Sequence, residues 1–193
     1  INILLLLLCI FIPGVAQNVS DGWNKNRTAR LNKPVFVYNN WSAYDELSDN
    51  IPLDEALAMK ELDHIVRLKK LGVQVDYYMM DAFWFDVNEG YRKWRPDCWP
   101  EGPKRWLDAC KREGIKPGLW FSTNLLRIGG EANTMKIIPE WESSVAEDGT
   151  TLCLFRGGYL HHLMQTLQMY ADMGIKTVSY THLRAHETKA NLV

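Results

Sequence analysis

The stretch LGVQVDYYMMDAFWF, residues 71–85, decides how this sequence folds. Gly72 follows a helical pattern and precedes an apolar run over 73–80, and Asp81 comes directly after that run. Glycine adopts the left-handed conformation that a helix C-terminus often needs at no steric cost. A mostly apolar run of this length is typical of a strand covered on both faces. The stretch therefore predicts a helix that ends near Gly72 and a buried strand whose end carries a carboxylate.

This unit of amphipathic helix, glycine and short strand occurs three times in the chain. The helix and strand of the three copies are expected at 53–71 with 73–80, 104–113 with 115–121, and 159–173 with 175–178. A further apolar run, 34–41, precedes the first copy and predicts one more strand. Alternation of strands and helices with short turns predicts an α/β fold with parallel strands and right-handed crossovers.

The motifs that are absent narrow the choice among parallel α/β folds. No G-x-G-x-x-G follows the first strand and no G-x-x-x-x-G-K-S/T occurs, which disfavours dinucleotide-binding and NTPase sheets. The remaining candidate is the (β/α)8 TIM barrel, which normally needs about 250 residues. We therefore predict a partial (β/α)8 barrel over 33–178, with the first three βα units and part of strand four. The alternative is a small, complete open α/β sheet.

Charge and composition exclude several classes of partner. The 193 residues include 22 Lys+Arg and 23 Asp+Glu, a net charge of −1, which argues against a nucleic-acid binder. An apolar content of 47% excludes overall disorder. Cys98, Cys110 and Cys153 allow at most one disulfide, and their spacing is not that of a zinc site. No motif calls for a metal, nucleotide or flavin, so we expect no cofactor.

The two ends of the chain differ from its middle. Residues 1–16 carry no charge and end in P-G-V-A, which is typical of a secretory signal peptide and is shorter than the about 20 residues of a membrane span. We expect a signal peptide with a clipped start at 1–16, a linker at 17–32, a secreted or periplasmic location and no membrane contact after cleavage. The alternative for 1–16 is a buried helix. Residues 179–193 resemble translated sequencing-adaptor read-through, and we interpret them as a non-native tail.

The predicted strand ends carry aromatic and acidic side chains. In a parallel barrel the active site lies at the C-terminal ends of the strands. The ends of the first three strands carry Trp41, Trp84 and Trp120, and Asp81 follows the second strand directly. An indole offers a flat apolar face for the C–H face of a pyranose, and a carboxylate accepts hydrogen bonds from two hydroxyls. The sequence thus predicts a saccharide site at these four residues, the alternative for Trp41 and Trp120 being to fill the core.

Three motifs carry a family resemblance: PVFVYNNWSAYDE at 34–46, VDYYMMDAFWF at 75–85 and GIKPGLWFS at 114–122. They resemble the catalytic barrel of the α-galactosidase clan and are most like glycoside hydrolase family 36, over 33–178. The resemblance implies that Trp41 and Asp81 bind the terminal galactose. The family's strand-two Asp-Asp-Gly-Trp is here D-A-F-W, and its strand-three Glu-Pro-Glu is S-T-N. These departures suggest a divergent subfamily, with another α-linked sugar as a candidate substrate.

The resemblance also implies a mechanism. Family members are retaining glycosidases whose two carboxylates stand about 5–5.5 Å apart. The nucleophile is expected at the end of strand four, beyond Lys176, and the acid/base on strand six, so no catalytic residue is assigned in this chain. We expect the parent protein to hydrolyse terminal α-linked sugars of oligosaccharides and this part of it to be inactive. The alternatives are a non-catalytic carbohydrate-binding barrel and, less favoured, a barrel lyase or isomerase acting on sugar phosphates.

Six other polar residues are weaker site candidates, and we expect them to be surface groups. Four acids occupy the predicted loops and are expected to be solvated: Asp86, Glu89, Asp97 and Glu131. The pair His161 and His162 opens the third helix and is expected on its surface.

Overall fold

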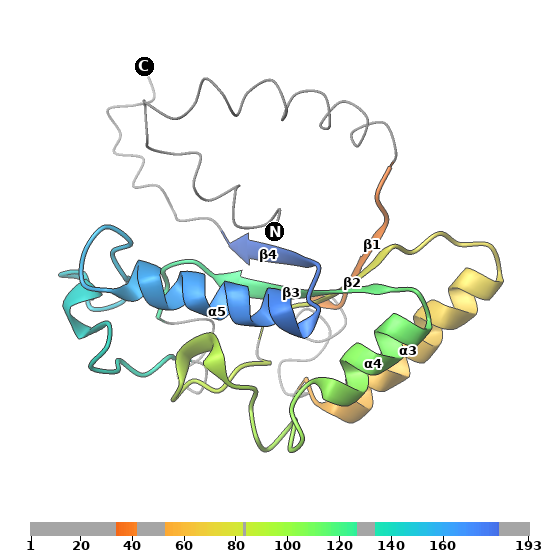
Figure 1. The fold of residues 1–193 in the computed structure, drawn as a ribbon, viewed down its shortest axis with the longest axis horizontal. Helices are drawn as coiled ribbons and strands as arrows, with labels where there is room; N and C mark the ends of the chain where they lie inside the picture. The colour runs from red at the N-terminus through yellow and green to blue at the C-terminus, as the bar shows by residue number, and fades with distance from the viewer. Residues whose placement is uncertain (1–33, 42–52, 83, 127–133, 182–193) are drawn as a thin grey trace.

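The computed structural model describes residues 34–41, 53–82, 84–126 and 134–181 (Figure 1). The principal elements, in chain order, are β1 Val37–Asn39, α3 Glu55–Lys70, β2 Tyr77–Met80, α4 Lys104–Arg112, β3 Lys116–Ser122, α5 Tyr159–Met173 and β4 Thr177–Thr181. Two short 3₁₀ helices, η2 Gly90–Arg92 and η4 Glu142–Ser144, interrupt the loops. The predicted signal peptide, the linker and residues 182–193 of the predicted tail lie outside the described residues.

The four strands form one parallel sheet in the order β1-β2-β3-β4. Strands that follow one another in the chain are therefore neighbours in the sheet. The register aligns Asn39 with Met79, Met79 with Gly118, and Gly118 with Thr177. The predicted alternation of helices with parallel strands is confirmed, and the fold is mixed α/β.

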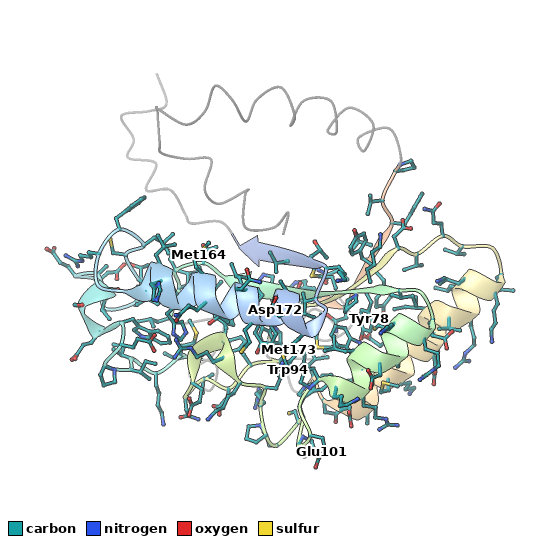
Figure 2. All side chains as sticks on the ribbon, in the orientation of Figure 1. Tyr78, Trp94, Glu101, Met164, Asp172 and Met173 are labelled. Carbon is teal, nitrogen blue, oxygen red and sulfur yellow. The ribbon has the colours of Figure 1, made fainter. Side chains whose placement is uncertain are left out.

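The three long helices cover one face of this sheet (Figure 1). Tyr78 of β2 points to that face, where its hydroxyl donates to Glu61 Oε2 of α3 at 2.6 Å and its ring packs edge-on against Trp106 of α4. Phe121 of β3 points the same way and packs against Tyr170 of α5. Figure 2 labels Tyr78 and Trp94 on the side of the sheet where the helices lie. In the described part of the chain, no helix is long and apolar enough to cross a membrane.

Local sequence signals explain where the helices begin and end. Asp54 caps α3 by accepting a hydrogen bond from the N–H of Leu57 at 2.7 Å, which satisfies one of the free N–H groups of the first turn. Gly72, with φ +92°, follows α3, and Gly174, with φ +109°, caps α5. Both conformations are left-handed, so a side chain there would be strained.

The strands differ in length from the predicted ones. β1 and β2 are shorter than the apolar runs that predicted them, because only part of each run pairs with a neighbouring strand. β4 is the reverse case. The pattern predicted its end at residue 178, whereas Ser179, Tyr180 and Thr181 continue the ladder opposite Trp120, Phe121 and Ser122 of β3. The predicted end of this strand at residue 178 is therefore corrected to Thr181.

A close approach between strands depends on Gly118 at the centre of β3. A Cβ atom built there would lie 2.6 Å from Thr177 Cγ2 and 2.8 Å from Met79 Cε. These distances are shorter than van der Waals contact, so only glycine fits between the two side chains. Because the Cβ direction of Gly118 meets Met79 and Thr177, all three residues lie on the same face, opposite to the helix layer.

Candidate functional site

Asp81 directly follows β2, and hydrogen bonds fix both its main chain and its carboxylate. Its N–H donates to Asn40 Oδ1 at 2.8 Å. Its Oδ2 accepts from Asn39 Nδ2 at 2.8 Å, and its Oδ1 accepts from the N–H of Ala82 at 2.8 Å. The carboxylate is thus held in one orientation by two donors.

The face on which Asp81 lies follows from the register. Asn39 aligns with Met79, on the face opposite to the helices, and it bonds the Asp81 carboxylate. Extending the register of β2 and β3 by one residue places Trp120 beside Asp81, on strands about 4.8 Å apart. β1 ends at Asn39, and Trp41 comes two residues later. The predicted residues Trp41, Asp81 and Trp120 thus lie at or just past the carboxyl ends of three adjacent strands, and we call them the row of strand ends.

The two indoles of this row differ in exposure. Trp120 is 7% exposed and belongs to the buried core cluster, whereas Trp41 is half-buried and packs against that cluster. The main-chain N–H of Trp41 donates to Asn39 Oδ1 at 2.7 Å, which turns the chain sharply after β1. Trp41 therefore presents more ring surface than Trp120.

The environment of Asp81 changes its acidity. The side chain is 7% exposed, and this burial raises the pKa of the carboxyl above its ordinary value. The hydrogen bonds from Asn39 and from the N–H of Ala82 lower the same pKa, because they stabilise the ionised form. A carboxylate that is largely shielded from water and is stabilised by hydrogen bonds from uncharged donors is suited to accept hydrogen bonds from a neutral ligand.

Trp84 lies apart from this row. Its side chain has no exposed surface, and its ring contacts Tyr91, Trp94, Phe121 and Tyr170 on the helix side of the sheet. Its indole N–H donates to the main-chain oxygen of Trp120 at 3.0 Å. The structure therefore places the predicted site residue Trp84 in the core, because the chain after Asp81 folds under the sheet instead of along its rim.

Sequence reasoning assigned no individual role to Asn39 and Asn40. Both belong to the N-N-W motif quoted for the resemblance, and the tandem amides directly before Trp41 were the available signal. Asn40 is 1% exposed, and within the described part of the chain its Nδ2 has no hydrogen-bond partner. Asn124, just past β3, is 5% exposed and likewise has an unpartnered Oδ1. Unpaired buried polar atoms are uncommon, so these two amides are notable at strand ends.

Three of the four acids expected in the loops form hydrogen bonds or ion pairs with nearby residues of the same loop. Asp86 accepts from the Nδ2 of Asn88 at 2.7 Å, Glu89 pairs with Lys93 at 3.1 Å, and Asp97 pairs with Arg95 at 3.4 Å. The fourth acid, Glu131, lies outside the described residues. Over the described ranges, no group of three or more His, Cys, Asp or Glu is arranged to hold a metal ion. Cys98, Cys110 and Cys153 are free thiols.

The expected surface position of His162 is wrong. His161 is exposed, but His162 is 1% exposed and packs edge-on against Trp141, with ring centroids 4.3 Å apart. Its Nδ1 lies 3.4 Å from Oε2 of Glu140, whose carboxylate is held by Arg92 at 2.7 and 2.8 Å. Burial is the main cause that lowers the pKa of His162. The side chain turns inward because the helix rotation between neighbouring residues carries it to the packed face.

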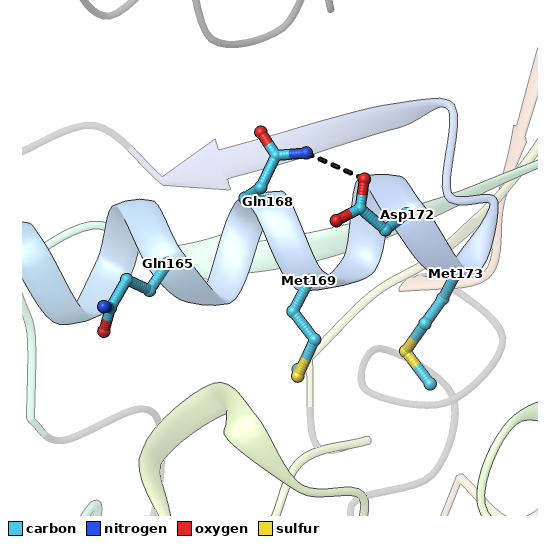
Figure 3. Close-up of a pocket in the computed structure, with 5 residues that line it drawn as sticks. All are labelled: Gln165, Gln168, Met169, Asp172 and Met173. Atoms are coloured by element: carbon cyan, nitrogen blue, oxygen red, sulfur yellow. Dashed lines mark hydrogen bonds between the residues drawn. The ribbon is translucent and has the colours of Figure 1, made fainter.

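Two hollows on the surface lie away from the row of strand ends. One runs along α5 and is lined by Gln165, Gln168, Met169, Asp172 and Met173 (Figure 3). Gln168 Nε2 donates to Asp172 Oδ1 at 2.8 Å within it. The other lies in the loop between β3 and α5 and is lined by Leu126, Thr134, Met135, Lys136, Ile137, Gly149 and Thr150. Neither contains a predicted site residue.

Comparison with known proteins gives matches among solved structures only. No protein-family model matches the sequence, and no curated protein matches it. An α-galactosidase of Lactobacillus brevis matches with a TM-score of 0.51 and 18% identity, over 77% of this chain and 20% of that chain. A family 36 α-galactosidase of Geobacillus stearothermophilus matches with a TM-score of 0.51 and 17% identity, over 77% of this chain and 21% of that chain.

A third match is the Thermus thermophilus α-galactosidase in complex with p-nitrophenyl α-D-galactopyranoside. Its TM-score is 0.52 and its identity 17%, over 76% of this chain and 30% of that chain. At these identities the likeness shows the fold alone. The chain spans 20% to 30% of the length of the three structures. The resemblance to an α-galactosidase catalytic domain that the motifs predicted is confirmed at the level of the fold.

Proposed function

We propose that this chain is the opening part of the catalytic (β/α)8 barrel of an exported, α-galactosidase-like glycoside hydrolase. Trp41, Asp81 and Trp120 would bind the terminal α-linked sugar of an oligosaccharide. The observation that carries the proposal is that these three residues lie at the carboxyl ends of adjacent parallel strands, with Asp81 and Trp120 on the face opposite to the helices. Barrel enzymes bind their substrates at that end of the strands.

The chemistry of the row suits a pyranose better than a charged or flat ligand. An ionised carboxylate has about four acceptor positions, and Asn39 and Ala82 use two of those on Asp81. The remaining positions suit two hydroxyl donors of one sugar ring. The indoles of Trp41 and Trp120 offer apolar faces against which the C–H groups of the ring can pack.

Exposed apolar residues at β1 support the partial-barrel part of the proposal. Val35, Phe36 and Val37 are 59%, 44% and 52% exposed. An exposed apolar edge strand is a ready template for pairing with another strand. In a closed barrel the last strand would cover this edge. The charge-free residues 1–16 support export of the parent protein, to the periplasm or the outside of the cell.

A second candidate is a carbohydrate-binding barrel without catalysis. It is favoured by the departures at two strand ends, where D-A-F-W at 81–84 replaces the family's Asp-Asp-Gly-Trp and S-T-N at 122–124 replaces its Glu-Pro-Glu. In the proposed enzyme the two catalytic carboxylates come from beyond this chain and act by double displacement.

Two measurements test the proposal. The 193-residue chain should bind p-nitrophenyl α-D-galactopyranoside saturably, with a change in tryptophan fluorescence, and release no p-nitrophenol. The gene product extended through its own strand four and beyond should hydrolyse aryl α-galactosides or related α-glycosides. Saturable binding by the extended product without cleavage would favour the binding barrel. Absence of both binding and cleavage for every α-glycoside tried would contradict the proposed function.

A further inference from the structure

We propose that Asn39 is a positioning residue of this site, which sets the separation between the Asp81 carboxylate and Trp41; this inference rests on the proposed function. Asn39 Nδ2 donates to Asp81 Oδ2 at 2.8 Å. Asn39 Oδ1 accepts from the main-chain N–H of Trp41 at 2.7 Å. One side chain therefore bridges the acidic and the aromatic residue of the row.

The two contacts require an amide. The carboxylate of Asp81 can only accept when ionised, so its partner must be a donor, and the Trp41 N–H can only donate, so its partner must be an acceptor. An asparagine presents one group of each kind on a single planar unit. An aspartate would keep the acceptor toward Trp41 but would set a second negative charge against Asp81.

The neighbouring asparagine performs a separate task. Asn40 Oδ1 accepts from the main-chain N–H of Asp81 at 2.8 Å and so fixes the backbone of the acid. Asn39, together with the N–H of Ala82, fixes the carboxylate itself and leaves about two of its acceptor positions for hydroxyl donors. The ligand class that this arrangement fits is a pyranoside with two hydroxyls close enough to donate to one carboxylate.

Exposure makes Asn39 a good residue to test. Asn39 is exposed, whereas Asn40 is 1% exposed, so replacing Asn39 removes little buried surface. The chain also offers a matched control in the loop after β2. Asn88 is exposed and donates its Nδ2 to a carboxylate oxygen of Asp86 at 2.7 Å, a contact local to that loop. Asn88→Ala therefore removes the same kind of hydrogen bond outside the site.

The experiment compares the 193-residue chain with its Asn39→Ala, Asn39→Asp and Asn88→Ala variants. Carboxyl carbon NMR follows the titration of Asp81, and tryptophan fluorescence follows binding of methyl α-D-galactopyranoside. Asn39→Ala should raise the pKa of Asp81 and weaken binding at pH 7 roughly tenfold, because a hydrogen bond to a charged group is lost. Asn88→Ala should change neither quantity.

Asn39→Asp separates positioning from a general structural effect. At pH 7 the two facing carboxylates repel each other, and binding should be weaker than in Asn39→Ala. As the pH is lowered toward 5, the pair can share one proton, and binding should recover in part. A variant that had merely lost structure would not regain affinity in this way.

The outcomes distinguish this inference from the proposed function. If the unchanged chain binds the galactoside but Asn39→Ala alters neither the pKa of Asp81 nor the affinity, the positioning role is wrong and the site stands. If neither the unchanged chain nor any variant binds a saccharide, the proposed function is wrong. If, in addition, Asn39→Ala leaves the pKa of Asp81 unchanged, the positioning role is wrong as well.

Discussion

The indole N–H of Trp84 donates to the main-chain oxygen of Trp120 at 3.0 Å, yet the two rings lie on opposite sides of the sheet. Trp120 belongs to the row that includes Asp81, while the Trp84 ring packs against Phe121 and Tyr170 in the helix layer. The bond thus anchors the loop after β2 to the strand that carries a candidate binding residue. A core residue and a candidate binding residue are therefore in direct contact here, and their contributions to stability and to saccharide binding can be measured separately.

Truncation of Trp84 should chiefly lower stability, whereas truncation of Trp41 should chiefly remove saccharide binding. Trp84→Ala should lower the free energy of unfolding by about 3–5 kcal/mol, because it empties the centre of an aromatic cluster. Trp41→Ala should cost less stability, since Trp41 is half-buried, and should abolish saccharide binding. Chemical denaturation and fluorescence titration measure the two effects. Equal losses of stability in both variants would show that Trp41 is a core residue.

Saccharide binding should depend on pH through Asp81. Burial raises the pKa of this carboxyl, so the folded state holds the proton more tightly than the unfolded chain does. Its contribution to stability is therefore most favourable at low pH and declines as the pH rises through the folded-state pKa. Affinity should change in the opposite direction, increasing with pH, because the ionised form accepts from two hydroxyls. Titrations between pH 4 and pH 7 should reveal this rise in the unchanged chain and none in Asp81→Asn.

Gly118→Ala should destabilise the sheet by about 1–3 kcal/mol through overpacking. Of the two atoms that a Cβ would meet, Met79 Cε is the end of a flexible side chain, whereas Thr177 Cγ2 is fixed close to its own backbone. Adding Thr177→Ser should therefore restore part of the lost stability, as a double-mutant cycle in urea would record. Strict additivity of the two substitutions would contradict the contact.

Acid should destabilise the fold through His162. The pKa of this buried histidine is lowered, mainly by burial and also by Arg92, so the unfolded chain takes up its proton first as the pH falls below about 6.5. The free energy of unfolding should thus decline between pH 7 and pH 5. His162→Phe should flatten that slope, whereas the exposed neighbour variant His161→Asn should retain it. The same slope in all three proteins would exclude His162 as its source.

Local pattern was sufficient for the helices and for the order of the strands. Asp54, Gly72 and Gly174 act within one or two turns of chain, so their effects are visible in the sequence. The C-terminal end of the last strand could not be predicted in this way. β4 continues through Ser179 to Thr181 because the partner strand β3 extends that far. This pairing joins residues distant in the chain, and the local pattern of apolar residues does not predict it.

The sequence by itself determined the alternating parallel fold and placed Trp41, Asp81 and Trp120 at strand ends, because hydrophobic periodicity and glycine conformation are properties of short segments. Only the tertiary structure decided which side each group occupies. Trp84, three residues beyond Asp81, turned to the core because the loop could bury its ring among aromatic side chains there. The bond from Asn39 to Asp81 joins two strands that meet only after folding, and no local pattern encodes such a contact.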